Sequence, residues 1–127
     1  RPNGICMDRV HSRLFVACRF QLVVLSATDG HVIAEVPVGI GVRPGVGADG
    51  TAFCGGKAFV AGGGGQFAVV GQSANGTFSV QQTLHVLNGG RAMAADTRSG
   101  AIYLPGTDAE GKRAALAPLK IQVIEKK

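Results

Sequence analysis

The segment GICMD at residues 4–8, followed after a short turn by LFVA at residues 14–17, recurs twice along the chain. The second copy is GTAF at 50–53 with AFVA at 58–61, and the third is AMAAD at 92–96 with AIYL at 101–104. The corresponding residues Gly4, Gly50 and Ala92 are therefore 46 and 42 positions apart. Repeats of this period are typical of four-stranded blades arranged around a channel. The spacing predicts an all-β fold, a β-propeller of antiparallel blades.

The first two units each continue with two further strands. These are QLVVL at 21–25 and HVIAEV at 31–36 in the first unit, then QFAVV at 66–70 and TFSVQQTL at 77–84 in the second. Asp29-Gly30 and Asn75-Gly76 join the two strands of each pair, and both dipeptides are strong hairpin signals. Gly30 and Gly76 are again 46 positions apart, which supports the repeat independently. In the strand at 31–36, the alternation predicts one side formed by Val32, Ala34 and Val36.

The third unit is shorter than the other two. Its first two strands are followed by a loop at 106–118 and a third strand, LKIQVI, at 119–124, with no fourth strand after it. We therefore predict blades at 1–42, 43–90 and 91–127, the last without its outer strand. Propellers use about four to eight blades, so a closed ring needs either further blades on the N-terminal side, which would make this chain a fragment, or another copy. In either case, the two outermost blade faces are expected to be apolar.

Several short motifs add a family resemblance to this repeat. RPNG at 1–4, Asp8, LFVA at 14–17, TDG at 28–30 and VPVG at 36–39 resemble the repeat unit of YVTN-type β-propellers, a bacterial WD40-like repeat family that includes the YncE-like proteins. The segments at 82–96 and 102–105 resemble the last blades of that family. Cys54 departs from the pattern, because the family has Asp at this strand end. The resemblance implies about three blades of a seven-bladed ring and a periplasmic or secreted binding or scaffold module.

The composition limits the classes of protein that fit this chain. Its 127 residues are 46% hydrophobic and 17% charged, as in a folded domain. No run of 18 apolar residues is present, so no membrane span is predicted. Cys6, Cys18 and Cys54 have no metal-ligand or CxxC spacing and are interpreted as structural thiols, although one pair could oxidise in an oxidising compartment.

Basic residues gather in the loops that should share one end of the blades. Connections between blades, and turns between the second and third strands of each blade, lie at the end where each first strand begins, here called the entry end. The ligand-binding candidates in these loops are Arg19, Arg43, Arg91, Lys112 and Arg113, with Arg1 at the matching position of the first unit and Asp108 and Glu110 as the only expected acids. Arginines suit bidentate contacts with carboxylate or phosphate. The alternative interpretation is ordinary solvated loop charge.

The sequence predicts no catalytic residue, no metal site and no cofactor. Asp8 and Asp96 occupy equivalent positions at strand ends, so both are expected to accept hydrogen bonds within turns. The glycine run at 62–65 precedes a strand and not a helix, which favours a turn over a phosphate-binding loop. His11, His31 and His85 have no ligand-spaced partners.

Three functional hypotheses follow from these observations. The leading one is a non-enzymatic module that binds an anionic small molecule or protein partner at the entry end. The alternative is a propeller enzyme, lactonase-like or dehydrogenase-subunit-like, whose active site lies partly in further blades. A structural surface protein is the third. Nucleic acid stays an alternative partner, although no Lys/Arg cluster is interleaved with aromatic residues.

Overall fold

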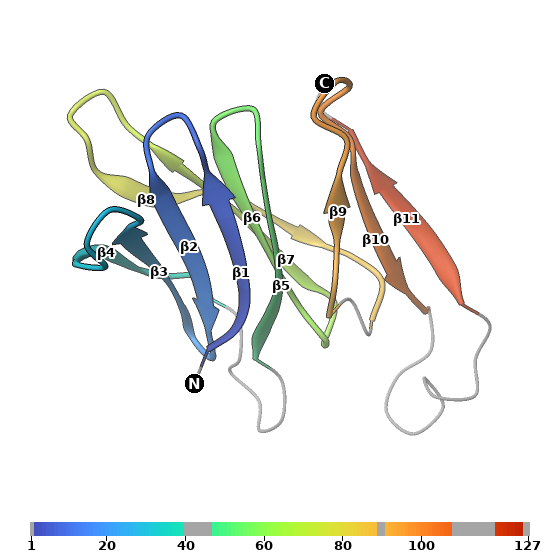
Figure 1. Ribbon diagram of the computed structural model, residues 1–127. Coiled ribbons are helices and arrows are strands. Elements are labelled where there is room, and N and C mark those ends of the chain that lie inside the picture. The colour runs from blue at the N-terminus through green and yellow to red at the C-terminus, as the bar shows by residue number, and fades with distance from the viewer. Residues whose placement is uncertain (1, 40–46, 89–90, 108–118, 126–127) are drawn as a thin grey trace.

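The chain forms three antiparallel β-sheets that stack side by side (Figure 1). The computed structural model describes residues 2–39, 47–88, 91–107 and 119–125, and every regular element in these ranges is a strand. The predicted all-β fold, a partial propeller of antiparallel blades, is confirmed. The predicted blade borders at 42/43 and 90/91 fall at 40–46 and 89–90, which lie outside the described residues.

Two of the sheets are four-stranded meanders. Blade 1 has the order β1-β2-β3-β4, and its strands are β1 (Pro2–Asp8), β2 (Arg13–Cys18), β3 (Gln21–Ser26) and β4 (Val32–Pro37). Blade 2 repeats this order with β5 (Ala48–Cys54), β6 (Lys57–Gly62), β7 (Gln66–Gln72) and β8 (Phe78–His85).

Blade 3 has three strands within the described residues. They are β9 (Ala94–Ala95), β10 (Ile102–Gly106) and β11 (Lys120–Ile124), in the order β11-β10-β9. The first strand is shorter than the expected 92–96, because only Ala94 and Ala95 pair with β10.

Glycines close the predicted hairpins. Gly30 and Gly76 have φ values of 80° and 89°, a left-handed conformation that glycine adopts without steric cost. The β5–β6 hairpin has a two-residue turn in which Gly55 and Gly56 have φ values of 60° and 78°, as a turn of the type I′ class requires. These local sequences therefore specify where each meander reverses.

Blade 2 is buried on both faces because it lies between the other two sheets. Successive side chains of a strand point to opposite faces, and in β6 Ala58 and Val60 pack toward blade 1 while Phe59 and Ala61 pack toward blade 3. The core between blades 1 and 2 is formed mainly by Phe15, Ala17, Leu22, Val24, Val36, Val38, Ala48, Ala58, Val60, Ala68 and Val70. The core between blades 2 and 3 includes Phe67, Val69, Val86, Ile102 and Leu104.

The repeated glycines lie where the first strands of neighbouring blades come close together. A Cβ atom on Gly4 would lie 2.1 Å from the carbonyl oxygen of Asp49 in β5, and one on Gly50 would lie 3.1 Å from the backbone nitrogen of Ala92. Glycine therefore lets the first strand of one blade pack directly against the first strand of the next.

The outer strand of blade 1 differs from the prediction at one residue. Val36 is buried and Ala34 packs against the core, as expected, but Val32 is exposed. The pairing of β3 with β4 shifts register between Val24 and Leu25. A bulge of this kind reverses which side a residue faces, so the prediction for Val32 was wrong.

Candidate functional site

The entry end of the blades carries two of the predicted binding residues within the described chain. The starts of β1 and β5 and the β2–β3 and β6–β7 turns all lie at the lower end of the molecule in Figure 1. This is the arrangement that the strand order requires, because consecutive antiparallel strands return to the same end.

Arg19 lies in the β2–β3 turn and is exposed. Its guanidinium carbon is 4.9 Å from the centroid of the Phe20 ring, in a cation–π contact. Its carbonyl oxygen accepts a hydrogen bond from the backbone nitrogen of Ala48 at 3.0 Å. A Cβ atom on Gly47 would be 3.3 Å from Arg19 Cγ, so the stem of this side chain packs against the start of β5.

Arg91 lies beside the start of β5, on the side opposite Arg19. Its Nε is 3.9 Å from Asp49 Oδ2, and the arginine side chain is 71% exposed while the aspartate is 24% exposed. A Cβ atom on Gly63 would lie 3.4 Å from Arg91 Nε, so the guanidinium is close to the β6–β7 turn. An exposed ion pair of this kind stabilises a fold by at most about 1 kcal/mol, which leaves Arg91 available to an external anion.

These contacts bring Arg19 and Arg91 to the two sides of the β5 start at residues 47–50. Asp108 and Glu110 were the only acids expected at the entry end, but Asp49 also lies there. It was missed because the residues directly before the expected strand start at Gly50 were not counted in the preceding loop; β5 itself begins at Ala48. The other predicted residues, Arg43, Lys112 and Arg113 together with Arg1, Asp108 and Glu110, lie outside the described residues.

The opposite end of the blades holds the two repeated aspartates in the predicted turn role. Asp8 Oδ1 accepts hydrogen bonds from the backbone nitrogens of Val10 (3.0 Å) and His11 (3.3 Å), and His11 Nδ1 lies 2.8 Å from Asp8 Oδ2. Asp96 accepts in the same way from the backbone nitrogen of Arg98, at 2.9 Å.

Asp96 also accepts from the Ser99 hydroxyl at 3.0 Å. The Arg98 backbone N–H, followed by the Ser99 hydroxyl, holds the pKa of the Asp96 carboxyl below its ordinary value. Both aspartates therefore close turns, as their equivalent positions predicted.

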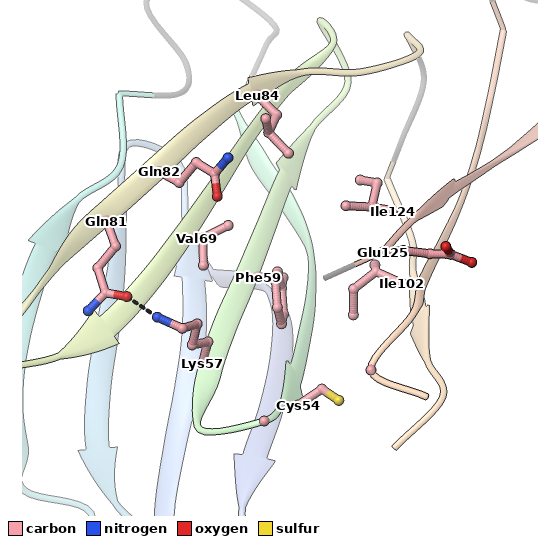
Figure 2. Close-up of a pocket in the computed structure, with 12 residues that line it drawn as sticks. Cys54, Lys57, Phe59, Val69, Gln81, Gln82, Leu84, Ile102, Ile124 and Glu125 are labelled. Carbon is pink, nitrogen blue, oxygen red and sulfur yellow. Dashed lines mark hydrogen bonds between the residues drawn. The ribbon is translucent and has the colours of Figure 1, made fainter. Parts of the chain in front are cut away.

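A cleft between blades 2 and 3 was not predicted from the sequence. It has a volume of about 660 Å³, and Figure 2 shows Phe59, Val69 and Leu84 of blade 2 facing Ile102 and Ile124 of blade 3 across it. Lys57 Nζ donates a hydrogen bond to Gln81 Oε1 at one wall. The remaining lining residues are Cys54, Gly55, Gln82, Gly100 and Glu125.

The cleft has a structural origin. β4 of blade 1 packs beside β8 of blade 2, whereas among the described residues blade 3 has no fourth strand to occupy the corresponding place beside β8. The apolar wall of blade 2 is therefore left open on its outer side. No sequence motif marks such a space, because it depends on packing between distant segments.

The three cysteines are free thiols in the structure. Cys6 packs against the core between blades 1 and 2, and this burial raises the pKa of its thiol to about 11, with the Thr51 hydroxyl offsetting part of the rise. The Cys54 thiol is directed at the carbonyl oxygen of Asp96, 3.8 Å away. The packing of Cys6 and Cys54 in the two cores is typical of structural thiols.

Within the described ranges, no group of three or more His, Cys, Asp or Glu side chains is placed to hold a metal ion. No helix in the same part of the chain is long and apolar enough to cross a membrane.

Comparisons with known proteins find similarity in structure and none in sequence. No protein-family model matches the chain, and no curated protein sequence matches it. The chain is similar to the β-propeller domain of Cps50 (Swd1) from Myceliophteria thermophila, with a TM-score of 0.35 and 9% identity. The match covers 99% of this chain and 58% of that one, so this chain spans less than two thirds of its neighbour. At this level of similarity the fold rests on the strand order and packing described above.

Proposed function

We propose that this chain is a non-enzymatic binding module that recognises an acidic protein partner at its entry end. The observation that carries the proposal is the position of Arg19 and Arg91, two exposed guanidinium groups on either side of the β5 start. Guanidinium groups form paired hydrogen bonds with carboxylates. The start of β5 at residues 47–50 lies between the two side chains.

The neighbours of the two arginines support this function. The Phe20 ring supports the Arg19 guanidinium from one side, and Asp49 restrains Arg91 at a distance that is longer than a direct hydrogen bond. The net charge of +5 favours association with acidic surfaces. The same chemistry would accept an anionic small molecule, so the test includes both.

The test compares two double variants with equal loss of charge. Arg19→Ala with Arg91→Ala removes the entry-end arginines, and Arg9→Ala with Arg98→Ala removes two exposed arginines from turns at the opposite end. Binding of a poly-glutamate peptide, and separately of citrate, is measured by NMR titration at low salt. We expect the first pair to weaken peptide binding roughly tenfold, a change of about 1.4 kcal/mol, and the control pair to change it much less.

An equal loss in both variants would contradict the proposal, because binding would then follow net charge alone. Asp49→Asn sharpens the test. Removing this carboxylate frees Arg91, so peptide affinity should rise modestly. Citrate binding without peptide binding would assign the site to a small anion and overturn the protein partner. Oligonucleotide binding that depends on the same two arginines would favour nucleic acid in its place.

The proposal extends to the family and the compartment. We place the chain among the exported YVTN-type, YncE-like propellers, on the repeat spacing, the glycine positions and the aspartates that close equivalent turns. Fractionation of bacterial cells that carry the natural gene tests this: a periplasmic or secreted product is expected, and a product confined to the cytoplasm would contradict it. Among the described residues no catalytic group is assembled at the entry end, and the enzymatic alternative stays a prediction.

A further inference from the structure

Two faces of the molecule are apolar and have no sheet packed on them within the described chain. The outward face of blade 1 carries Ile5 and Met7, which are 62% and 44% exposed. The alternation along β2 and β3 adds Leu14, Val16, Val23 and Leu25. The outward face of blade 3 carries Tyr103, which is 41% exposed. The strand pairing places Ala94, Pro105, Ile121 and Val123 on the same face. Glu35, the β4 partner of Val23, is a charged residue on the same face of blade 1.

The strand registers make these two faces equivalent to the two sides of the internal interfaces between blades. Phe15 pairs with Cys6, Phe59 pairs with Ala52, and Tyr103 pairs with Ala94. The three aromatic residues therefore occupy the same position in successive blades. Phe15 packs toward blade 2 and Phe59 toward blade 3, while Tyr103 faces outward from blade 3.

The other half of the interface follows from the same registers. Phe15 stacks on Phe53, with ring centroids 5.2 Å apart and an interplanar angle of 15°. Phe53 pairs with Ala58 in blade 2, and the equivalent pair in blade 1 is Met7 with Leu14. Met7 on the outward face of blade 1 is therefore the counterpart of Phe53.

We infer that the outward face of blade 3 docks on the outward face of blade 1 in a second copy of this chain, so that Tyr103 of one copy packs on Met7 of the other. The internal interface between blades 1 and 2 is the template, since it joins the same two kinds of face in the same order. A methionine sulfur against an aromatic ring is a favourable contact. The inference does not depend on the function proposed for the arginines.

This contact is head-to-tail, and such contacts either close into rings or continue as open chains. Two copies with three blades each give six blades, one fewer than the resemblance to YVTN-type propellers implies but within the range of about four to eight that closes a propeller. Both apolar faces of each copy are then covered at once. A dimer is therefore the smallest assembly that leaves neither face exposed.

The first measurement needs no variant. Sedimentation equilibrium of the 127-residue chain should give roughly twice the monomer mass of 13.0 kDa, falling to the monomer mass on dilution. A single species at the monomer mass up to about 200 μM would overturn the inference and leave further blades of a longer chain as the occupant. Masses that keep rising with concentration would overturn ring closure.

Mixing two variants tests the head-to-tail arrangement. Met7→Asp and Tyr103→Asp each place a charge in both contacts of the dimer, so each variant alone should be monomeric. A mixture of the two retains one intact contact, between Met7 of the Tyr103 variant and Tyr103 of the Met7 variant, so a heterodimer should return. A contact between two identical faces would instead be lost in only one variant, and that result would overturn the proposal.

Controls separate association from folding. Val10→Asp changes an exposed apolar residue in the β1–β2 turn, outside both faces, and should leave the dimer intact. Far-UV circular dichroism checks that each variant is folded. If either aspartate variant unfolds, Met7→Gln and Tyr103→Ser replace them, with at least a tenfold weaker dimer expected for each. Unchanged dimerisation in both milder variants would also overturn the inference.

Discussion

The interface between blades 1 and 2 is closed across its whole width, whereas the interface between blades 2 and 3 is closed only at its inner strands. In the first, β1 packs on β5 at one side and β4 packs beside β8 at the other. In the second, β5 meets β9, but a cleft of about 660 Å³ lies beside β8. Glycine in the inner strands lets the first strands of neighbouring blades come close together, while a fourth strand fills the outer part of the interface.

The largest expected loss of stability comes from the interface between blades 1 and 2, which is closed, compared with the interface between blades 2 and 3, which is partly open. Phe15 is fully buried, stacks on Phe53 and meets Phe78 edge-on with centroids 6.0 Å apart. Phe15→Ala should therefore destabilise the fold by about 3 to 5 kcal/mol. Phe59→Ala, at the equivalent position beside the cleft, should cost clearly less, because Phe59 is only half-buried. Urea unfolding of both variants measures the difference, and equal losses would contradict the comparison.

A smaller loss of stability is expected from substitutions in β1 and β5, the inner strands of blades 1 and 2. Gly4→Ala would bring a Cβ atom to 2.1 Å from a backbone oxygen of β5, whereas Gly50→Ala would reach only 3.1 Å from the backbone of Ala92. Overpacking costs about 1 to 3 kcal/mol, and we expect Gly4→Ala near the upper end and Gly50→Ala near the lower end. Thermal unfolding ranks the two variants. A more severe loss for Gly50→Ala would mean that blades 2 and 3, and not blades 1 and 2, make the tighter approach.

The turn closed by Asp96, at the end of the blades opposite Arg19 and Arg91, should make the stability of the fold depend on pH. The pKa of Asp96 is lowered in the folded chain by the Arg98 backbone N–H and the Ser99 hydroxyl. Its contribution to stability is therefore fully present above the ordinary pKa of 3.8 and is lost as the pH falls through the lower folded value. The stability gap between the natural chain and Asp96→Asn should narrow over that acidic range. Unfolding curves from pH 7 to pH 2 measure it, and a gap independent of pH would contradict this cause.

The smallest expected effect is on the reactivity of Cys6. Its thiol has a pKa raised to about 11 by burial between blades 1 and 2, and the thiolate is the reactive form. Alkylation of Cys6 by iodoacetamide, followed by peptide mass spectrometry, should stay slow at pH 8 and accelerate toward pH 11. Unfolding in urea should restore rapid reaction at pH 8. Rapid alkylation of Cys6 in the folded chain at pH 8 would show that this interface is open.

Much of the fold was predictable because the signals that specify it are local. The glycine turns and the repeated apolar strands located each meander, and the equivalence of Asp8 and Asp96 located two of its turns. Asp49 was missed at the entry end because the residues directly before Gly50 were not counted in the preceding loop. Val32 was assigned to the wrong side because a bulge between Val24 and Leu25 is set by pairing and leaves no clear mark in the sequence.

The cleft was not predictable in the same way. Its walls come from β5, β6, β7, β8, β10 and β11 and from the turns that join them, and it exists because no strand of blade 3 lies opposite β8 in the described chain. The basic residues of the entry end were located by topology alone, and the structure adds their contacts only for Arg19 and Arg91.

Blade 1 packs face to face on blade 2 through the rings of Phe15 and Phe53. The most direct test is a nuclear Overhauser experiment on the 13.0 kDa chain, with the rings of Phe15 and Phe53 labelled selectively. Their centroids are 5.2 Å apart, so strong ring-to-ring cross-peaks are predicted between residues 38 positions apart in the sequence. If Phe15 shows cross-peaks only to residues of β1, β2 and β3, the sheets do not stack in this way and the account is contradicted.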